Sequence, residues 1–179
     1  MRVVAALAAV FWLGASPAFA GVESATAGGF VLQAEAEVAA SPDQVWRRLP
    51  HVERWWSGEH TYSGDARRLS LDPRAGGCWC ERWGDGQSIE HMHVVLVTEH
   101  DGVRTLPLTG GLGPLQELAV NGALTFTVAP LASGAKITMT YRVSGDPALG
   151  LDQMAPLVDS VLLEQFGRFS RYSTTGSPE

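Results

Sequence analysis

The 179-residue sequence predicts an α+β domain in which a curved antiparallel sheet wraps around a long C-terminal helix. We expect about six to seven strands, with two short helices after the first strand. Two observations predict this fold. Segments with the two-residue apolar period of half-buried strands follow one another through the middle of the chain. The last segment instead has an apolar stripe at helical spacing, which must be buried against the sheet.

The first strand is expected over residues 30–38, where apolar and polar residues alternate. Ser41 and Pro42 then predict the start of a helix, because a serine hydroxyl caps the first turn and a proline ring fits the first helical position. A proline ends this helix, and residues 51–56 are expected to form the second short helix.

The other strands follow in chain order. They are expected over residues 67–71, 78–83, 87–98, 103–109, 123–129 and 136–143. Asp85-Gly86 predicts a hairpin with a two-residue turn, because this pair tolerates the positive φ of a type I′ turn. A glycine-rich corner occupies residues 110–114. The long helix is expected over residues 149–172, and Pro156 should start or kink it.

Residues 1–20 have the pattern of a secretory signal peptide. An arginine precedes a short apolar run and an Ala-x-Ala site, which predicts cleavage after Ala20 and a periplasmic or secreted protein. Segments 21–29 and 173–179 are expected to be flexible, which leaves residues 30–172 as the folded domain. No later segment approaches the ~18 apolar residues of a membrane span, so no stable membrane insertion is expected after cleavage.

Composition excludes some classes of function. The net charge is −6, and lysines and arginines form no run longer than a pair, so nucleic acid is not an expected partner. The glycine-rich corner lacks the Lys-Ser/Thr of a phosphate loop, and no nucleophile elbow is present. We therefore predict no cofactor, while the oligomeric state stays open.

Both cysteines lie in the first strand of the hairpin, at Cys78 and Cys80. Alternate residues of an extended strand lie farther apart than a disulfide allows, so a bond between these cysteines is not expected. In the register of a two-residue turn they face His91 and His93, and these four side chains are candidate zinc ligands. Regular strands fit tetrahedral zinc poorly, so a partly exposed outer face without metal is the preferred interpretation.

The same register pairs Glu81 with Glu90 on the more apolar face of the hairpin. Opposed carboxylates can act as general acid and base on a bound ligand. Polar contacts to a ligand and structural pairing with an arginine are the alternatives. A slip of one residue in the turn would pair Glu81 with Ile89 and separate the two carboxylates.

Several sequence segments resemble the START/polyketide-cyclase-like helix-grip superfamily, abbreviated SRPBCC. They are residues 41–46 (SPDQVW), Trp55-Trp56, Gly76-Gly77, Glu90-His91-Met92, residues 112–116 and residues 158–168. The chain is most similar to the bacterial branch related to the heat-shock-protein ATPase activator domain. The resemblance implies a helix-grip fold whose members bind lipids, hormones or polyketides, and of which some catalyse cyclisation or dehydration. It implies no catalytic residue here.

Together these observations predict an exported protein that binds a small apolar or amphipathic molecule between its sheet and its last helix. The candidate ligand-binding residues are Trp55, Trp56, Trp79, Glu81, Glu90, Met92, Leu115, Phe126, Met154, Val158 and Leu162. One alternative is a cyclase or dehydratase that uses Glu81 and Glu90. The other is a protein-interaction module of the ATPase-activator kind, which export disfavours.

Overall fold

The computed structural model describes residues 19–179, with side chains from residue 21 onward. The predicted signal segment 1–20 therefore lies almost wholly outside the described residues, and both cleavage and export stay predictions. Within the described range, no helix combines the length and apolar character that crossing a membrane requires.

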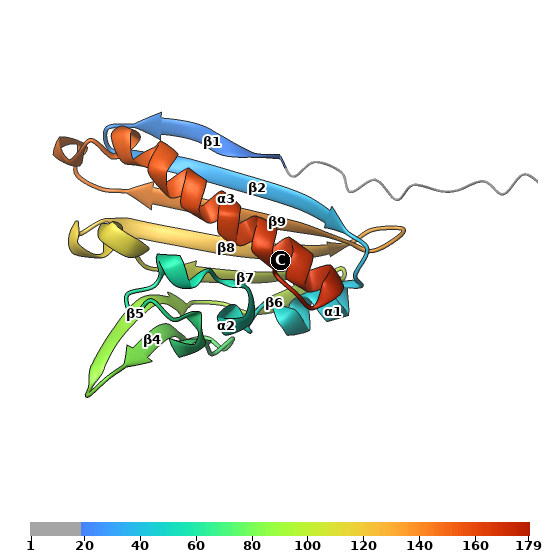
Figure 1. Cartoon of the computed structure of the whole chain (residues 1–179). Helices are drawn as coiled ribbons and strands as arrows, with labels where there is room; N and C mark the ends of the chain where they lie inside the picture. Colours follow the sequence, from blue (N-terminus) through green and yellow to red (C-terminus); the bar gives the residue numbers. More distant parts are fainter. Residues whose placement is uncertain (1–18) are drawn as a thin grey trace, which may run out of the picture.

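These residues form one curved antiparallel sheet with a long helix across it (Figure 1). The strands are β1 (Phe19–Thr26), β2 (Gly29–Val38), β3 (Leu69–Leu71), β4 (Cys78–Trp83), β5 (Gln87–Val94), β6 (Thr98–His100), β7 (Val103–Thr109), β8 (Asn121–Pro130) and β9 (Ala135–Ser144). Their order is β1-β2-β9-β8-β7-β5-β4-β3, and β6 pairs with β7. The predicted fold class is confirmed, with more strands than expected.

Two regions of the sheet differ from the sequence prediction. Residues 21–29 were expected to be flexible, but most of them belong to β1, which pairs with β2. Their side chains are largely exposed, so the segment lacks the apolar alternation that marks a half-buried strand. The expected strand 87–98 is divided into β5 and β6 by an exposed segment, residues 95–97.

The helices are α1 (Pro42–Arg48), α2 (Val52–Trp55) and α3 (Leu151–Thr175), and a 3₁₀ turn, η3, spans Gly113–Glu117. The hydroxyl of Ser41 accepts a hydrogen bond from the Gln44 amide at 3.3 Å, as expected for a capped start of α1. Residues 173–175, predicted to be part of a flexible tail, continue α3, and Ser173 is buried. Gly176 ends the helix with φ 82°, a conformation that glycine adopts without strain.

An aromatic core fills the space between the sheet and the second half of α3. Trp55, the last residue of α2, lies at its centre and packs against rings from the next residue in the chain and from β4, β8 and α3. These rings are Trp56, Trp79, Phe126 and Phe169, at centroid distances of 5.0–6.4 Å from Trp55. Because these large side chains gather at one end of the helix, the space beneath its first half is left for a cavity.

Candidate functional site

The β4–β5 hairpin has a different register from the one that its sequence predicts. Trp83 pairs with Gln87 across a three-residue loop, whereas a two-residue turn was expected. Gly84 and Gly86 both have positive φ, 52° and 81°, and this permits the longer loop. Glu81 consequently pairs with Ile89, and the predicted pairing of Glu81 with Glu90 is wrong.

A β-bulge in β5 then restores the expected register farther along the hairpin. Trp79 pairs with Met92 and Cys80 pairs with Glu90, so His91 is an additional residue on β5. Both His91 and Met92 are consequently buried, whereas the flanking residues Glu90 and His93 are exposed. The bulge therefore moves His91 from the outer face of the sheet, where simple alternation placed it, to the inner face.

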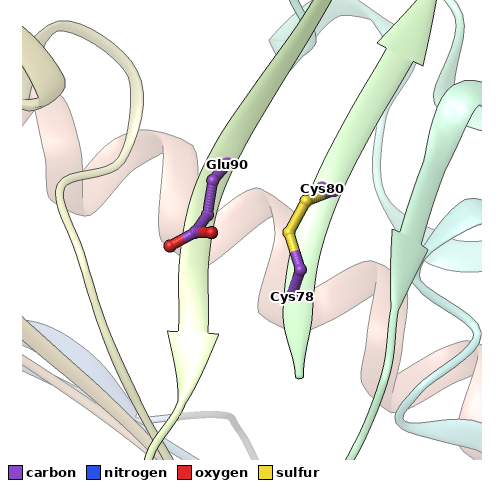
Figure 2. A group of neighbouring side chains, drawn as sticks. All are labelled: Cys78, Cys80 and Glu90. Carbon is purple, nitrogen blue, oxygen red and sulfur yellow. A yellow bond between two sulfur atoms is a disulfide. The ribbon is translucent and has the colours of Figure 1, made fainter. Parts of the chain in front are cut away.

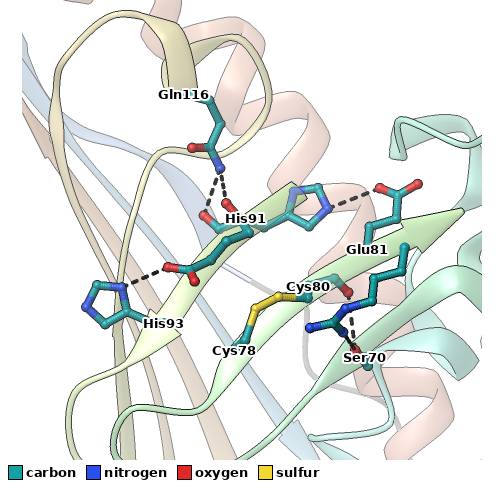
Figure 3. Close-up of a disulfide and its surroundings, with 9 residues drawn as sticks. Ser70, Cys78, Cys80, Glu81, His91, His93 and Gln116 are labelled. Carbon is teal, nitrogen blue, oxygen red and sulfur yellow. Dashed lines mark hydrogen bonds and ion pairs between the residues drawn. A yellow bond between two sulfur atoms is a disulfide. The ribbon is translucent and has the colours of Figure 1, made fainter. Parts of the chain in front are cut away.

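Glu81 and His91 form a buried pair on this inner face. Oε2 of Glu81 lies 3.1 Å from Nε2 of His91, and Figure 3 shows the two side chains pointing toward each other. The same carboxylate accepts hydrogen bonds from the backbone amides of Tyr62 at 3.0 Å and Ser63 at 2.5 Å. Glu81 thus holds the imidazole and also fixes the loop that follows α2.

The surroundings lower the pKa of both members of this pair. Burial opposes ionisation of Glu81, but hydrogen bonds from Ser63, Tyr62 and His91 outweigh it, so the pKa of Glu81 lies below its ordinary value of 4.5. Burial disfavours the protonated form of His91, and this effect outweighs the stabilisation of that form by Glu81. The pKa of His91 therefore lies below its ordinary value of 6.5. At neutral pH the pair therefore consists of a carboxylate and a neutral imidazole.

These shifts predict that acid destabilises the protein in two steps. As the pH falls below about 6.5, His91 takes up a proton in the unfolded chain before it does so in the folded protein, and this favours unfolding. Glu81 adds a further loss of stability below about 4.5 for the same reason. Urea unfolding as a function of pH checks this, and His91→Phe should remove the first step. The exposed His93→Phe should retain it, and an unchanged profile in His91→Phe would contradict the assignment.

A cavity of about 840 Å³ lies between the first half of α3, η3 and the loop after α2. Its apolar wall includes Trp56, Leu112, Met154, Val158, Val161 and Leu162. His91 lines it, as do Tyr62 and the exposed carboxylates of Glu59 and Glu117. The side chain of Leu157, 71% exposed, lies at its mouth. The site is therefore a mostly apolar chamber that a buried imidazole borders.

A tyrosine fixes the glycine-rich corner that forms one side of this chamber. The hydroxyl of Tyr141 accepts a hydrogen bond from the Leu112 amide at 3.2 Å and donates to the Gly110 carbonyl at 3.3 Å. Burial raises the pKa of Tyr141 to about 12, so the hydroxyl stays protonated and can donate. This contact connects β9 to the loop before η3 and holds Leu112 in the wall.

The structure brings only part of the predicted ligand-binding set to this cavity. Four residues of that set line it: Trp56, Met154, Val158 and Leu162. Five are buried in the core outside the cavity lining: Trp55, Trp79, Met92, Leu115 and Phe126. Glu81 lies behind His91, and Glu90 is exposed on the opposite face. Sequence reasoning missed His91 and Tyr62 as cavity residues, because no residue pattern marks the bulge that turns His91 inward.

The two cysteines form a disulfide, contrary to the sequence expectation. Figure 2 shows their bonded sulfurs beside the carboxylate of Glu90. The Cα atoms of Cys78 and Cys80 are 5.3 Å apart, within the range of about 4.4–6.8 Å that a disulfide accepts. The expectation was wrong because it assumed a fully extended strand, whereas β4 is irregular next to the bulge.

The disulfide and the bulge also separate the four candidate zinc ligands in this structure. The sulfurs of Cys78 and Cys80 are bonded to each other, and His91 lies on the other face of the sheet. His93 remains on the outer face, where its Nδ1 is 3.1 Å from Oε1 of Glu90. The four candidate ligands therefore do not converge on one point.

Replacing both cysteines with serine is expected to cost little stability. The bond closes a loop of only three residues, so the chain-entropy relation gives about 1–2 kcal/mol. Urea unfolding of the double variant measures the loss, and peptide mass spectrometry without reduction confirms the bond in the parent protein. A loss above about 3 kcal/mol would show that the disulfide does more than restrict the unfolded chain.

Comparisons with known proteins identify the fold. No family model and no curated protein matches the sequence. CalU16 from Micromonospora echinospora is similar, with a TM-score of 0.54 and 12% identity over 91% of this chain and 86% of that chain. DynU16, a putative protein of the dynemicin biosynthetic locus, gives 0.55 and 22% over 83% of this chain and 48% of that chain.

Norcoclaurine synthase from Thalictrum flavum, in complex with dopamine and hydroxybenzaldehyde, is a third similar structure. Its TM-score is 0.52, with 17% identity over 79% of this chain and 83% of that chain. At these identities the likenesses establish the fold and leave the activity open.

Proposed function

We propose that this chain, a helix-grip domain of the START-like (SRPBCC) superfamily, binds a small hydrophobic or amphipathic molecule beneath the first half of α3. The observation that carries the proposal is the cavity of about 840 Å³ with its mostly apolar wall. Its volume falls within the range of about 300–1,000 Å³ that is typical of small-molecule sites. A ligand there would be stabilised by apolar contacts with Met154, Val158 and Leu162, since burial of apolar surface drives such binding.

The likeness to norcoclaurine synthase supports this proposal. That structure holds dopamine and hydroxybenzaldehyde, so the fold can accommodate small aromatic molecules.

We also propose that the protein is exported with cleavage after Ala20, and N-terminal sequencing of protein from a periplasmic extract tests that point. The likeness to the ATPase-activator branch stays a prediction, as does the interaction-module alternative.

Filling the cavity is expected to abolish ligand binding. Val158→Trp places an indole into the space beneath α3, so the affinity for the fluorescent apolar probe 1-anilinonaphthalene-8-sulfonate should fall at least tenfold. Fluorescence titration measures the affinity, and circular dichroism confirms that the variant is folded. Native mass spectrometry of the purified parent protein would show whether a ligand is retained.

Val97→Trp is the matched control for this experiment. Val97 lies in the exposed segment between β5 and β6, outside the cavity lining, so the probe should bind this variant as it binds the parent protein. If the parent does not bind the probe, or if both variants bind it equally, the proposed site is wrong.

The enzyme alternative needs different residues from those that the sequence indicated. Glu81 is buried on the inner face and Glu90 is exposed on the outer face, so they cannot act as an acid–base pair on one ligand. The fold similarity is equally compatible with a cyclase and with a binding protein. A cyclase would have to rely on other groups that line the cavity, among which His91 is buried.

A further inference from the structure

We propose that His91 selects the ligand by accepting a hydrogen bond from it at Nδ1, and that the ligand is therefore a hydrophobic alcohol or phenol. This inference rests on the proposed function, because it assigns a chemical class to the occupant of the same cavity. It follows from the tautomer of His91, the accessibility of its second ring nitrogen and the surroundings of its ring. Figure 3 shows His91 with its partner Glu81.

Glu81 determines which ring nitrogen of His91 carries the proton. The carboxylate receives the Tyr62 and Ser63 amides in addition to Nε2 of His91, and three donors converging on it favour its ionised form. An ionised carboxylate only accepts hydrogen bonds, so Nε2 must be the protonated nitrogen. A neutral imidazole carries a single N–H, which leaves Nδ1 as an acceptor.

The second ring nitrogen is available to a ligand. Within residues 21–179, Nδ1 of His91 has no hydrogen-bond partner. Three other side-chain atoms also lack a partner and are fully buried, but Nδ1 is not one of them and therefore keeps some accessible surface. Those atoms are Trp79 Nε1, Gln165 Nε2 and Ser173 Oγ. The His91 side chain is only 8% exposed, and it lines the cavity. The small exposed part of the ring therefore faces the cavity. A largely buried acceptor without a partner favours a ligand that brings a donor.

The surroundings of the imidazole favour a flat, apolar ligand with that donor. The rings of Tyr62 and Trp79 flank His91 at centroid distances of 5.9 and 6.4 Å, and the helix wall is apolar. The Tyr62 hydroxyl donates to the Gly113 carbonyl at 3.2 Å, so it already has a partner of its own. Glu59 and Glu117 are exposed. The other imidazole of the lining, His60, is 31% exposed and contacts Glu164 at 3.1 Å, so His91 is the more deeply buried imidazole of the described lining.

A matched pair of probes tests the assignment. Isothermal titration with 2-naphthol and 2-methoxynaphthalene compares two molecules that differ in whether they can donate a hydrogen bond. The parent protein should prefer 2-naphthol about tenfold, the size expected when a buried acceptor gains its partner. His91→Phe should bind both probes equally, while His93→Phe, the same substitution on the outer face, should keep the preference.

A nitrogen NMR spectrum of the histidine side chains provides a second measurement on the unmodified protein. The His91 signals are identified by their loss in His91→Phe, or by selective labelling if that variant does not fold. Nδ1 should be unprotonated in the free protein and should shift with 2-naphthol but not with 2-methoxynaphthalene.

The possible outcomes separate this inference from the proposed function. Equal affinities for the two probes in the parent protein would overturn the role of His91, as would a preference that persists in His91→Phe or a protonated Nδ1. Failure of 2-naphthol to bind a protein that does bind 1-anilinonaphthalene-8-sulfonate would overturn the ligand class alone. Failure of the parent protein to bind 1-anilinonaphthalene-8-sulfonate would overturn the proposed cavity function itself.

Discussion

Replacing Glu81 with alanine is expected to destabilise the protein by about 3–5 kcal/mol, a loss typical of removing one partner from a buried charged network. The Glu81 side chain has no exposed surface and accepts hydrogen bonds from Tyr62, Ser63 and His91. The variant would leave all three donors without their acceptor and a cavity where the carboxylate had been. Urea unfolding followed by tryptophan fluorescence measures the loss.

Two further variants make this result specific. Glu81→Gln keeps one acceptor oxygen but turns an amide group toward backbone donors, so its loss should be smaller than that of Glu81→Ala and still exceed 1 kcal/mol. Glu90→Ala removes an exposed carboxylate whose one hydrogen-bonded partner among residues 21–179 is His93, and it should cost less than about 0.5 kcal/mol. Similar losses for Glu81→Ala and Glu90→Ala would contradict the burial and the pairing described here.

Trp55→Ala is expected to be equally damaging, at about 3–5 kcal/mol, because it empties the centre of the aromatic core. The Trp55 side chain is 1% exposed, and its ring packs against Trp56 and against residues of β4, β8 and α3. Its indole N–H donates to the Leu49 carbonyl at 3.1 Å, so alanine also leaves that carbonyl unpaired. Denaturant unfolding should show the loss as a lower midpoint.

The matched control for the core is an exposed apolar residue on α3. Leu157→Ala removes a side chain that is 71% exposed, so its cost should stay within about 0.5 kcal/mol. Trp55→Phe should fall between the two, since it keeps much of the ring packing but loses the hydrogen bond to Leu49. If Trp55→Ala and Leu157→Ala cost the same, the aromatic cluster is not what holds α3 against the sheet.

The arrangement of these residues explains why side chains fill the space beneath the second half of α3, whereas a cavity lies beside the first half. Phe169 packs against Trp55 and Phe126 beneath the second half of the helix, and Phe166 is also buried there. Met154 and Val158, in the first half, face open space instead. We therefore expect substitutions of Phe166 and Phe169 to affect mainly stability, and substitutions of Met154 and Val158 to affect mainly ligand binding.

Local patterns in the sequence were sufficient to predict most of the fold. Alternation predicted β2, β8 and β9 to within two residues at each end, because one face of each strand is buried and the other is less so. Ser41 and Pro42 predicted the start of α1, and the helical spacing of apolar residues predicted α3. Each of these signals depends on the chemistry of neighbouring residues, which a sequence contains directly.

The candidate site depends on contacts that no local pattern encodes. A longer loop and a bulge together decide that His91 faces inward, and a shift of one residue moves every following side chain to the opposite face. The Cys78–Cys80 bond depends on the same irregular backbone, and β1 depends on backbone pairing with β2 rather than on its side chains. The sequence thus specified the elements and their apolar faces. Tertiary pairing decided which polar side chains meet, because the length of the hairpin loop and the position of the bulge determine which face of the sheet each side chain occupies.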